Sequence, residues 1–223
     1  MPKPPLFSIE PFEDDSRGPA VRGMLHRPRG PSTRGLVLTH GAGSDCEAPL
    51  LQALASAFAL AGVTVLRCDL PFRQARPVGP PLPVTAARDR DGLRRAVGAL
   101  RSLVDGRVSL GGHSYGGRQA SVLLAEEPAL VDTLLLLSYP LHPPRRPREL
   151  RTEHFSALRT PALFVHGSRD PFGSVAQLSK AIERIPARTR LLAVEGVGHD
   201  LGRGGPDTPT TSIVAVFRRL SGT

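Results

Sequence analysis

The chain is 223 residues long with a formal net charge of +9, and 40% of its residues are hydrophobic. This length and composition predict one globular domain over residues 1–223 and exclude a disordered chain, a collagen and a coiled coil. No apolar run reaches the roughly 18 residues that a membrane span needs, so no membrane partner is expected. The start of the chain is rich in proline and lacks the pattern of a secretion signal. We therefore expect a cytoplasmic protein.

The positive charge is weak evidence for nucleic-acid binding. Of the 29 basic residues, all except Lys3 and Lys180 are arginine. Scattered arginines beside many Ala, Gly and Pro residues are typical of GC-rich coding, and only 4% of residues are aromatic, too few for a base-stacking set. Nucleic acid is therefore an unfavoured partner. Cys46 and Cys68 predict neither a disulfide framework nor a metal site, and we expect no metal and no cofactor.

Short apolar runs alternate with segments of helical periodicity along the chain. After two weaker edge strands near residues 6–9 and 20–26, the expected strands are Leu36–Thr39, Val63–Leu66, Val108–Leu110, Thr133–Leu137, Ala162–Val165 and Leu191–Val194. The expected helices are Leu50–Ala61, Leu93–Val104 followed by Gly106, a segment after Ser114, Val175–Ile185, and Thr208–Leu220 with Thr208 as N-cap. This alternation predicts an α/β fold, with a mostly parallel sheet covered by helices on both faces.

Two proline-rich stretches, Pro71–Thr85 and Pro140–Pro147, are expected to be loops. In an open parallel sheet, ligands bind beyond the carboxyl ends of the strands. The residues that follow the predicted strands are His40–Gly43, Asp69, Gly112–Gly116, Ser138, Tyr139, Asp170 and His199. We therefore expect the chemistry of the protein at this edge.

Ser114 lies in the pattern Gly-x-Ser-x-Gly between a predicted strand and a predicted helix, the context of a nucleophile elbow. A serine hydroxyl needs an imidazole to take its proton and an acid to orient that imidazole. Asp170 and His199 follow the next strands in the required order Ser, Asp, His. Two simpler interpretations stay open: Asp170 as a helix N-cap, and His40–Gly43 as an ordinary tight turn.

Four motifs together resemble the alpha/beta-hydrolase superfamily, and within it the dienelactone-hydrolase-like branch: LTHGAGSD, GGHSYGGR, LSYPLHPP and FVHGSRDPFG. That branch also includes relatives found in a chromatin-associated complex. The resemblance implies an oxyanion hole made by the backbone N–H groups of Ala42 and Tyr115, and two such amides would stabilise charge that develops in the transition state. Dienelactone hydrolases proper carry a cysteine nucleophile, whereas this chain has Ser114 in the elbow.

We expect a serine hydrolase that cleaves a small ester or thioester through an acyl-enzyme intermediate. Only some 20 residues separate Tyr139 from Thr160, which leaves no room for a separate cap domain. The substrate pocket should then be open, with five residues contributing to it: Gly41, Phe72, Tyr139, His142 and Phe172. The partner implied is a small acyl substrate.

Two alternatives remain open besides nucleic-acid binding. One is a serine peptidase of the same fold, although such enzymes usually carry an additional domain. The other is a non-catalytic interaction protein on a hydrolase fold, with the arginine cluster Arg145, Arg146, Arg148 and Arg151 as its contact surface. The same cluster is also compatible with an anion-recognising rim or with a solvated loop.

Overall fold

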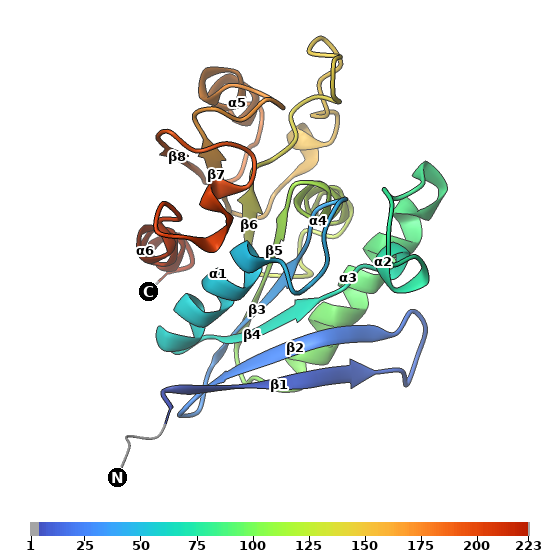
Figure 1. The fold of residues 1–223 in the computed structure, drawn as a ribbon, viewed down its shortest axis with the longest axis vertical. Coiled ribbons are helices and arrows are strands. Elements are labelled where there is room, and N and C mark those ends of the chain that lie inside the picture. Colours follow the sequence, from blue (N-terminus) through green and yellow to red (C-terminus); the bar gives the residue numbers. More distant parts are fainter. Residues whose placement is uncertain (1–4, 223) are drawn as a thin grey trace.

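The computed structural model describes residues 5–222, which form one eight-stranded sheet with helices on both faces (Figure 1). The strands are β1 (Phe7–Asp14), β2 (Val21–Pro28), β3 (Arg34–Thr39), β4 (Thr64–Cys68), β5 (Arg107–His113), β6 (Thr133–Leu137), β7 (Ala162–Gly167) and β8 (Thr189–Val194). Their order is β1-β2-β4-β3-β5-β6-β7-β8. β2 is antiparallel to β1 and β4, and the pairs from β4 through β8 are parallel. The predicted α/β class is confirmed. Both N-terminal strands form and are antiparallel, but only β1 lies at an edge, because β2 pairs with both β1 and β4.

The helices are α1 (Pro49–Leu60), α2 (Pro71–Ala75), α3 (Ala86–Arg101), α4 (Tyr115–Glu126), α5 (Val175–Ile182) and α6 (Thr210–Leu220). Helices α1 and α6 contribute Phe58 and Phe217 to the hydrophobic core on one face of the sheet. Helices α3, α4 and α5 contribute to the core on the other face, through residues such as Leu93 and Leu123. Because both faces are covered, central strands such as β6 are buried at every position, which explains their continuous apolar sequences.

Two local predictions around the helices were wrong. The stretch Pro71–Thr85 contains helix α2 and a 3-10 turn over Pro83–Thr85, since proline is favourable at the first helical position where no N–H partner is needed. Thr208 does not cap α6, which begins at Thr210. The Thr208 hydroxyl instead donates to the Leu201 carbonyl at 2.6 Å and accepts from the Gly204 N–H at 2.9 Å, so it closes the loop before the helix.

The third helix also differs from its predicted bounds, because it starts at Ala86 and ends at Arg101. Gly106 therefore lies beyond the helix, directly before β5. A Cβ atom there would lie 2.1 Å from the Thr33 carbonyl oxygen, so the close approach of these two segments accounts for the glycine.

The segment that joins β6 to β7, residues 138–161, holds one short 3-10 helix over Phe155–Ala157 and no further helix or strand. The sequence-based expectation of a fold without a cap domain is therefore confirmed. Within residues 5–222, no helix is both long enough and apolar enough to cross a membrane.

Two histidines away from the carboxyl edge of the sheet are held uncharged by burial. His26 is fully buried and its Nε2 accepts from Arg67 Nε at 2.9 Å. His154 lies 2.8 Å from the Ser121 hydroxyl through its Nε2. Burial, and then the nearby charges of Arg67 and Arg118 respectively, lower the pKa of each histidine to about 4.

These pKa shifts predict a loss of stability on mild acidification. Between pH 6.5 and about pH 4, His26 and His154 bind protons in the unfolded chain but stay neutral in the folded protein. The free energy of unfolding therefore falls as the pH falls. Each group contributes a slope of up to about 1.4 kcal/mol per pH unit. Urea unfolding at pH 7 and pH 5 should therefore show a smaller loss for His154→Gln than for the wild type. An equal loss of unfolding free energy in both proteins would contradict the lowered pKa of His154.

Candidate active site

The turn between β5 and α4 presents Ser114 in a strained backbone conformation. Its φ is 50° and its ψ is −113°, which few non-glycine residues adopt. The Ser114 N–H donates to the Leu137 carbonyl at 2.8 Å, which fixes the turn to the end of β6. A Cβ at residue 116 would lie 2.5 Å from the His40 carbonyl oxygen, and one at residue 112 would lie 2.5 Å from the Gly117 nitrogen. Glycine at these positions therefore permits the tight turn that the sequence pattern predicts.

Ser114, His199 and Asp170 form one hydrogen-bonded chain from three strand ends. The Ser114 hydroxyl lies 2.8 Å from His199 Nε2, and His199 Nδ1 lies 2.7 Å from Asp170 Oδ2. The other carboxylate oxygen of Asp170 accepts from the Phe172 N–H at 2.8 Å. With both its oxygens engaged, the buried carboxylate holds the imidazole with Nδ1 protonated and Nε2 free to accept a proton.

The N-cap interpretation of Asp170 is wrong. The N-cap of α5 is Ser174, whose hydroxyl and the Gln177 side chain form a reciprocal capping box. Asp170 lies four residues earlier, at the end of β7, and its side chain faces His199 instead.

Neighbouring aromatic rings confine the His199 imidazole. The ring centroid of Phe172 lies 4.4 Å from that of His199. On another side, His113 Nε2 lies 2.8 Å from the His199 backbone carbonyl, and burial lowers the pKa of His113 to about 4. A neutral His113 donates to that carbonyl and so holds the loop that carries His199. His166 lies farther away, with its Nε2 2.7 Å from the Gly173 carbonyl. Both histidines are thus packed neighbours of the site.

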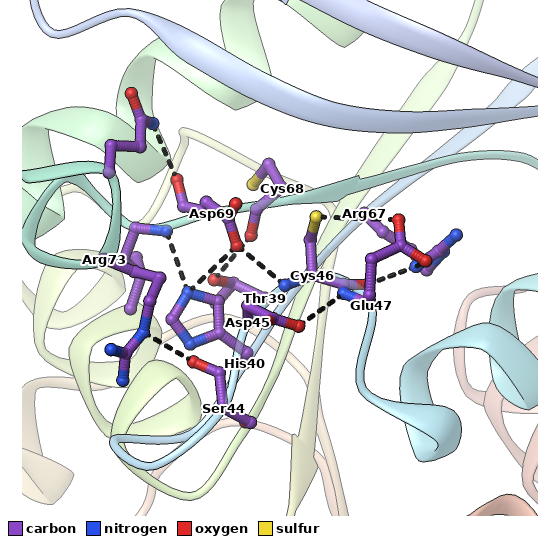
Figure 2. A network of polar contacts seen from close by, with 12 residues as sticks. Thr39, His40, Ser44, Asp45, Cys46, Glu47, Arg67, Cys68, Asp69 and Arg73 are labelled. Carbon is purple, nitrogen blue, oxygen red and sulfur yellow. Dashed lines mark hydrogen bonds and ion pairs between the residues drawn. The ribbon is translucent and has the colours of Figure 1, made fainter. Parts of the chain in front are cut away.

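The loop after β3 is fixed by contacts to its carbonyl groups. His40 Nδ1 lies 2.8 Å from the Gly41 carbonyl, while the Leu70 N–H donates to His40 Nε2 at 3.1 Å (Figure 2). Burial lowers the pKa of His40, so its ring is neutral and Nδ1 is the donor. The C=O of Gly41 and the N–H of Ala42 belong to one trans peptide and point in opposite directions. A fixed Gly41 carbonyl therefore fixes the direction of the Ala42 N–H.

Arg73 holds the same loop from helix α2. Its Nη2 donates to the Ala42 carbonyl at 2.8 Å and its Nε donates to the Ser44 carbonyl at 2.9 Å; Figure 2 shows the Ser44 contact. Further bonds from the guanidinium reach the backbone of residues 76–79. The Arg73 side chain is buried and makes five hydrogen bonds to carbonyl groups. It therefore links the loop after β3 rigidly to the segment at residues 76–79 that follows α2.

A cavity of about 500 Å³ opens beside Ser114. Its lining includes three predicted site residues, Ala42, Tyr115 and Phe172. Neither the backbone N–H of Ala42 nor that of Tyr115 has a hydrogen-bond partner among residues 5–222. Gly41 lies next to the serine, because a Cβ there would lie 3.4 Å from the Ser114 Cβ.

Of the five predicted substrate-binding residues, Phe172 alone lines this cavity; Gly41 lies beside it, and the other three are buried behind it. Tyr139 is fully buried and its hydroxyl donates to the Arg151 carbonyl at 2.5 Å. Phe72 is buried and packs edge-on against the Tyr115 ring, with centroids 5.5 Å apart. His142 is buried, with its Nδ1 3.0 Å from the Pro143 carbonyl. These side chains support the walls of the cavity from behind.

Sequence reasoning missed two lining residues of α4, Arg118 and Gln119. The stretch Pro80–Pro83, which also borders the cavity, belongs to one of the two proline-rich stretches that the sequence places near the pocket. The sequence alone could have predicted that Arg118 borders the site, since a residue four places after Ser114 in a helix lies one turn along the same face. Arg151 was named as one of four clustered arginines, for which an anion-recognising rim was one interpretation, and nothing in its sequence context sets it apart from the other three.

The two cysteines are not part of the site around Ser114. Cys46 and Cys68 are both buried and unpaired, and burial raises the pKa of Cys46 to about 12. Both are separate from the elbow that carries Ser114. Across residues 5–222, no group of three or more His, Cys, Asp or Glu side chains is placed to hold a metal ion.

Comparison with known proteins agrees with the fold. The chain matches the model of a family described as an alpha/beta hydrolase domain over residues 32–212. Its structure is similar to dienelactone hydrolase from Anabaena variabilis, with a TM-score of 0.74 and 20% identity over 96% of this chain and 97% of that one. It is also similar to Est1E from Butyrivibrio proteoclasticus, with a TM-score of 0.76 and 16% identity over 96% of this chain and 99% of that one.

A third similar structure is an alpha-beta serine hydrolase homologue from Coxiella burnetii. Its TM-score is 0.72 and its identity 17%, over 94% of this chain and 96% of that one. These likenesses support the fold, and the family match covers more than half of the chain. The resemblance noted in the sequence is thereby confirmed: this chain belongs to the alpha/beta hydrolase family.

Proposed function

We propose that this protein is a serine hydrolase that cleaves a small ester or thioester through an acyl-enzyme intermediate. The observation that carries the proposal is the continuous chain of hydrogen bonds from Asp170 through His199 to Ser114, at a strained turn that borders a cavity. An ordinary turn serine needs neither a strained backbone nor an imidazole held by a buried carboxylate. Relatives of this fold include an esterase domain from Rhodothermus marinus, which is compatible with the class proposed.

In the first half of the reaction, Ser114 Oγ attacks the substrate carbonyl carbon while His199 Nε2 takes the hydroxyl proton. The carbonyl oxygen becomes an oxyanion and accepts hydrogen bonds from the N–H groups of Ala42 and Tyr115, which have no acceptor among residues 5–222. Asp170 stays ionised and stabilises the imidazolium. The tetrahedral intermediate then collapses, the bond to the alcohol or thiol breaks, and His199 returns the proton to that leaving group.

In the second half, a water molecule loses a proton to His199 and attacks the acyl carbon of the ester on Ser114. The second tetrahedral intermediate uses the same two amides. Its collapse breaks the bond to Ser114 Oγ, which recovers the proton from His199, and the carboxylic acid leaves. No redox partner or further reactant besides water is required.

The open cavity favours an enzyme over a non-catalytic interaction protein. The interaction hypothesis predicts a pocket blocked by the proline-rich loops. Prolines from both loops, including Pro81 and Pro144, form part of the cavity wall, but a volume of about 500 Å³ remains beside Ser114. The space beside the hydroxyl is therefore large enough for a small acyl group.

The triad proposal predicts activity on 4-nitrophenyl esters of short acids, with an initial burst of nitrophenolate matching the enzyme concentration if deacylation is slow. Ser114→Ala should lower kcat by about 10⁴-fold or more, and Asp170→Asn by about 10²-fold to 10⁴-fold, because the imidazole loses its orientation. Ser156→Ala, which alters an exposed serine, serves as the matched control and should retain the wild-type rate. Full activity in Ser114→Ala would refute the proposed nucleophile.

The contacts of Arg73 predict a separate effect on the oxyanion hole, with Arg73 as a positioning residue. Arg73→Gln removes the bonds to the Ala42 and Ser44 carbonyls, so the loop that carries the Ala42 N–H is held only from the Gly41 side, by the His40 contact. We expect kcat to fall by about tenfold to 10²-fold, with a smaller change in KM, since an oxyanion forms only in the transition state. Binding of a phenylboronic acid, which forms a tetrahedral adduct with serine, should weaken in parallel.

The exposed Arg76→Gln variant is the control for this experiment, because it changes a nearby arginine side chain that makes none of these bonds. If Arg73→Gln raised KM alone and left boronate binding intact, Arg73 would support the fold without positioning the loop.

A further inference from the structure

Two arginine side chains face the cavity beside Ser114. Arg118 comes from the second turn of α4, and Arg151 comes from the segment that joins β6 to β7. No aspartate or glutamate of residues 5–222 belongs to the cavity lining. Within this part of the chain, the cavity wall therefore carries two positive charges and no negative charge.

Neither guanidinium has a partner among the described residues. Within residues 5–222, the side chains of Arg118 and Arg151 make no hydrogen bond and have no carboxylate within ion-pair distance. The Nε of Arg118 is buried and has no hydrogen-bond partner in this part of the chain. A buried N–H group that lacks an acceptor lowers the stability of the fold. We therefore infer that the N–H of Arg118 Nε finds an acceptor outside the chain.

Hydrogen bonds fix the backbone at both arginines. The Arg118 N–H donates to the Ser114 carbonyl at 2.9 Å, so its side chain starts one helical turn from the nucleophile. The Arg151 N–H donates to the Leu141 carbonyl at 2.8 Å, and its own carbonyl accepts from the buried Tyr139 hydroxyl at 2.5 Å. This is why Tyr139 matters to the cavity although it does not line it.

The electrostatic surroundings leave these charges unneutralised. Burial lowers the pKa of Arg151, and the like charge of Arg118 lowers it further. The carboxylates of Glu149 and Glu153 oppose this effect, but neither forms an ion pair with Arg151, and Glu149 pairs with Arg146 at 3.4 Å. Two like charges are thus kept close together at the cavity wall.

We propose that Arg118 and Arg151 form a subsite for a carboxylate on the substrate, so that the preferred ester carries a negative charge on its acyl or its alcohol part. The inference rests on the proposed function and names its substrate class. A planar guanidinium offers two parallel N–H donors that match a carboxylate, and a partly buried pair binds it more strongly than a solvated one. Of the arginine cluster near residues 145–151, only Arg151 takes this role, because the others are exposed and outside the cavity lining.

The test compares charged and neutral esters of matched shape. One pair carries the charge on the acyl side: mono-4-nitrophenyl adipate against 4-nitrophenyl hexanoate. The other carries it on the alcohol side: 4-acetoxybenzoate against 4-acetoxybenzamide. We expect kcat/KM to favour the anion in one pair by at least about tenfold, the value of one charge-assisted hydrogen bond.

Substitutions connect that preference to the two arginines. Arg118→Gln and Arg151→Gln should each reduce the ratio of kcat/KM between the charged and neutral esters by about tenfold or more. Arg118→Lys should retain part of it, since the charge stays while the planar fork is lost. Arg148→Gln, on the exposed part of the same loop, is the matched control and should leave the ratio unchanged.

Adipate itself gives a readout that needs no turnover. Calorimetry on the folded wild type should detect binding that weakens in Arg118→Gln, with melting temperatures confirming that each variant is folded. Hydrolysis of neutral esters without any preference for the charged ones, or a preference that survives both glutamine variants, would overturn the subsite. Absence of hydrolysis in every pair would instead overturn the proposed function, and adipate binding would then decide on the subsite alone.

Discussion

The strained turn at Ser114 is the constraint on which the rest of the site depends. Its positive φ is maintained by the hydrogen bond to the Leu137 carbonyl and by the close contact of Gly116 with the loop after β3. Both contacts exist only because β3, β5 and β6 are adjacent in the sheet. The same adjacency places the ends of β7 and β8 next in order, where Asp170 and His199 complete the chain of hydrogen bonds. The order of the strands thus determines where Ser114, Asp170 and His199 meet.

The walls of the cavity come from segments outside the sheet. His40 and Arg73 fix the carbonyl groups of Gly41, Ala42 and Ser44, and the Ala42 N–H has no acceptor in the described part of the chain. Arg118 and Arg151 add positive charge to the cavity lining, and the Tyr139 hydroxyl holds the Arg151 backbone carbonyl. Polar groups in a partly buried cavity interact more strongly than in bulk water, because water screens them less there. The proposed reaction and the proposed substrate class therefore follow from one arrangement of fixed donors.

The sequence was sufficient to predict the strands, the elbow and the order of the three hydrogen-bonded residues, because buried parallel strands and glycine turns have strong local patterns. It was insufficient for residues whose role depends on tertiary contacts. Arg73 lies in a stretch predicted to be a loop, and only the fold shows it reaching Ala42 and Ser44. Tyr139 follows a strand end as a cavity residue would, yet its side chain turns into the core. Strand ends indicate position, and side-chain direction is set by packing.

The activation of Ser114 is the central claim, and covalent labelling tests it most directly. Intact mass would be measured after treatment with a fluorophosphonate probe for the wild type, Ser114→Ala and His199→Ala. The account predicts a single adduct on the wild type, none on Ser114→Ala, and much slower labelling of His199→Ala, because the imidazole no longer removes the hydroxyl proton. A folded wild type that gains no adduct, or an adduct that persists in Ser114→Ala, would contradict it.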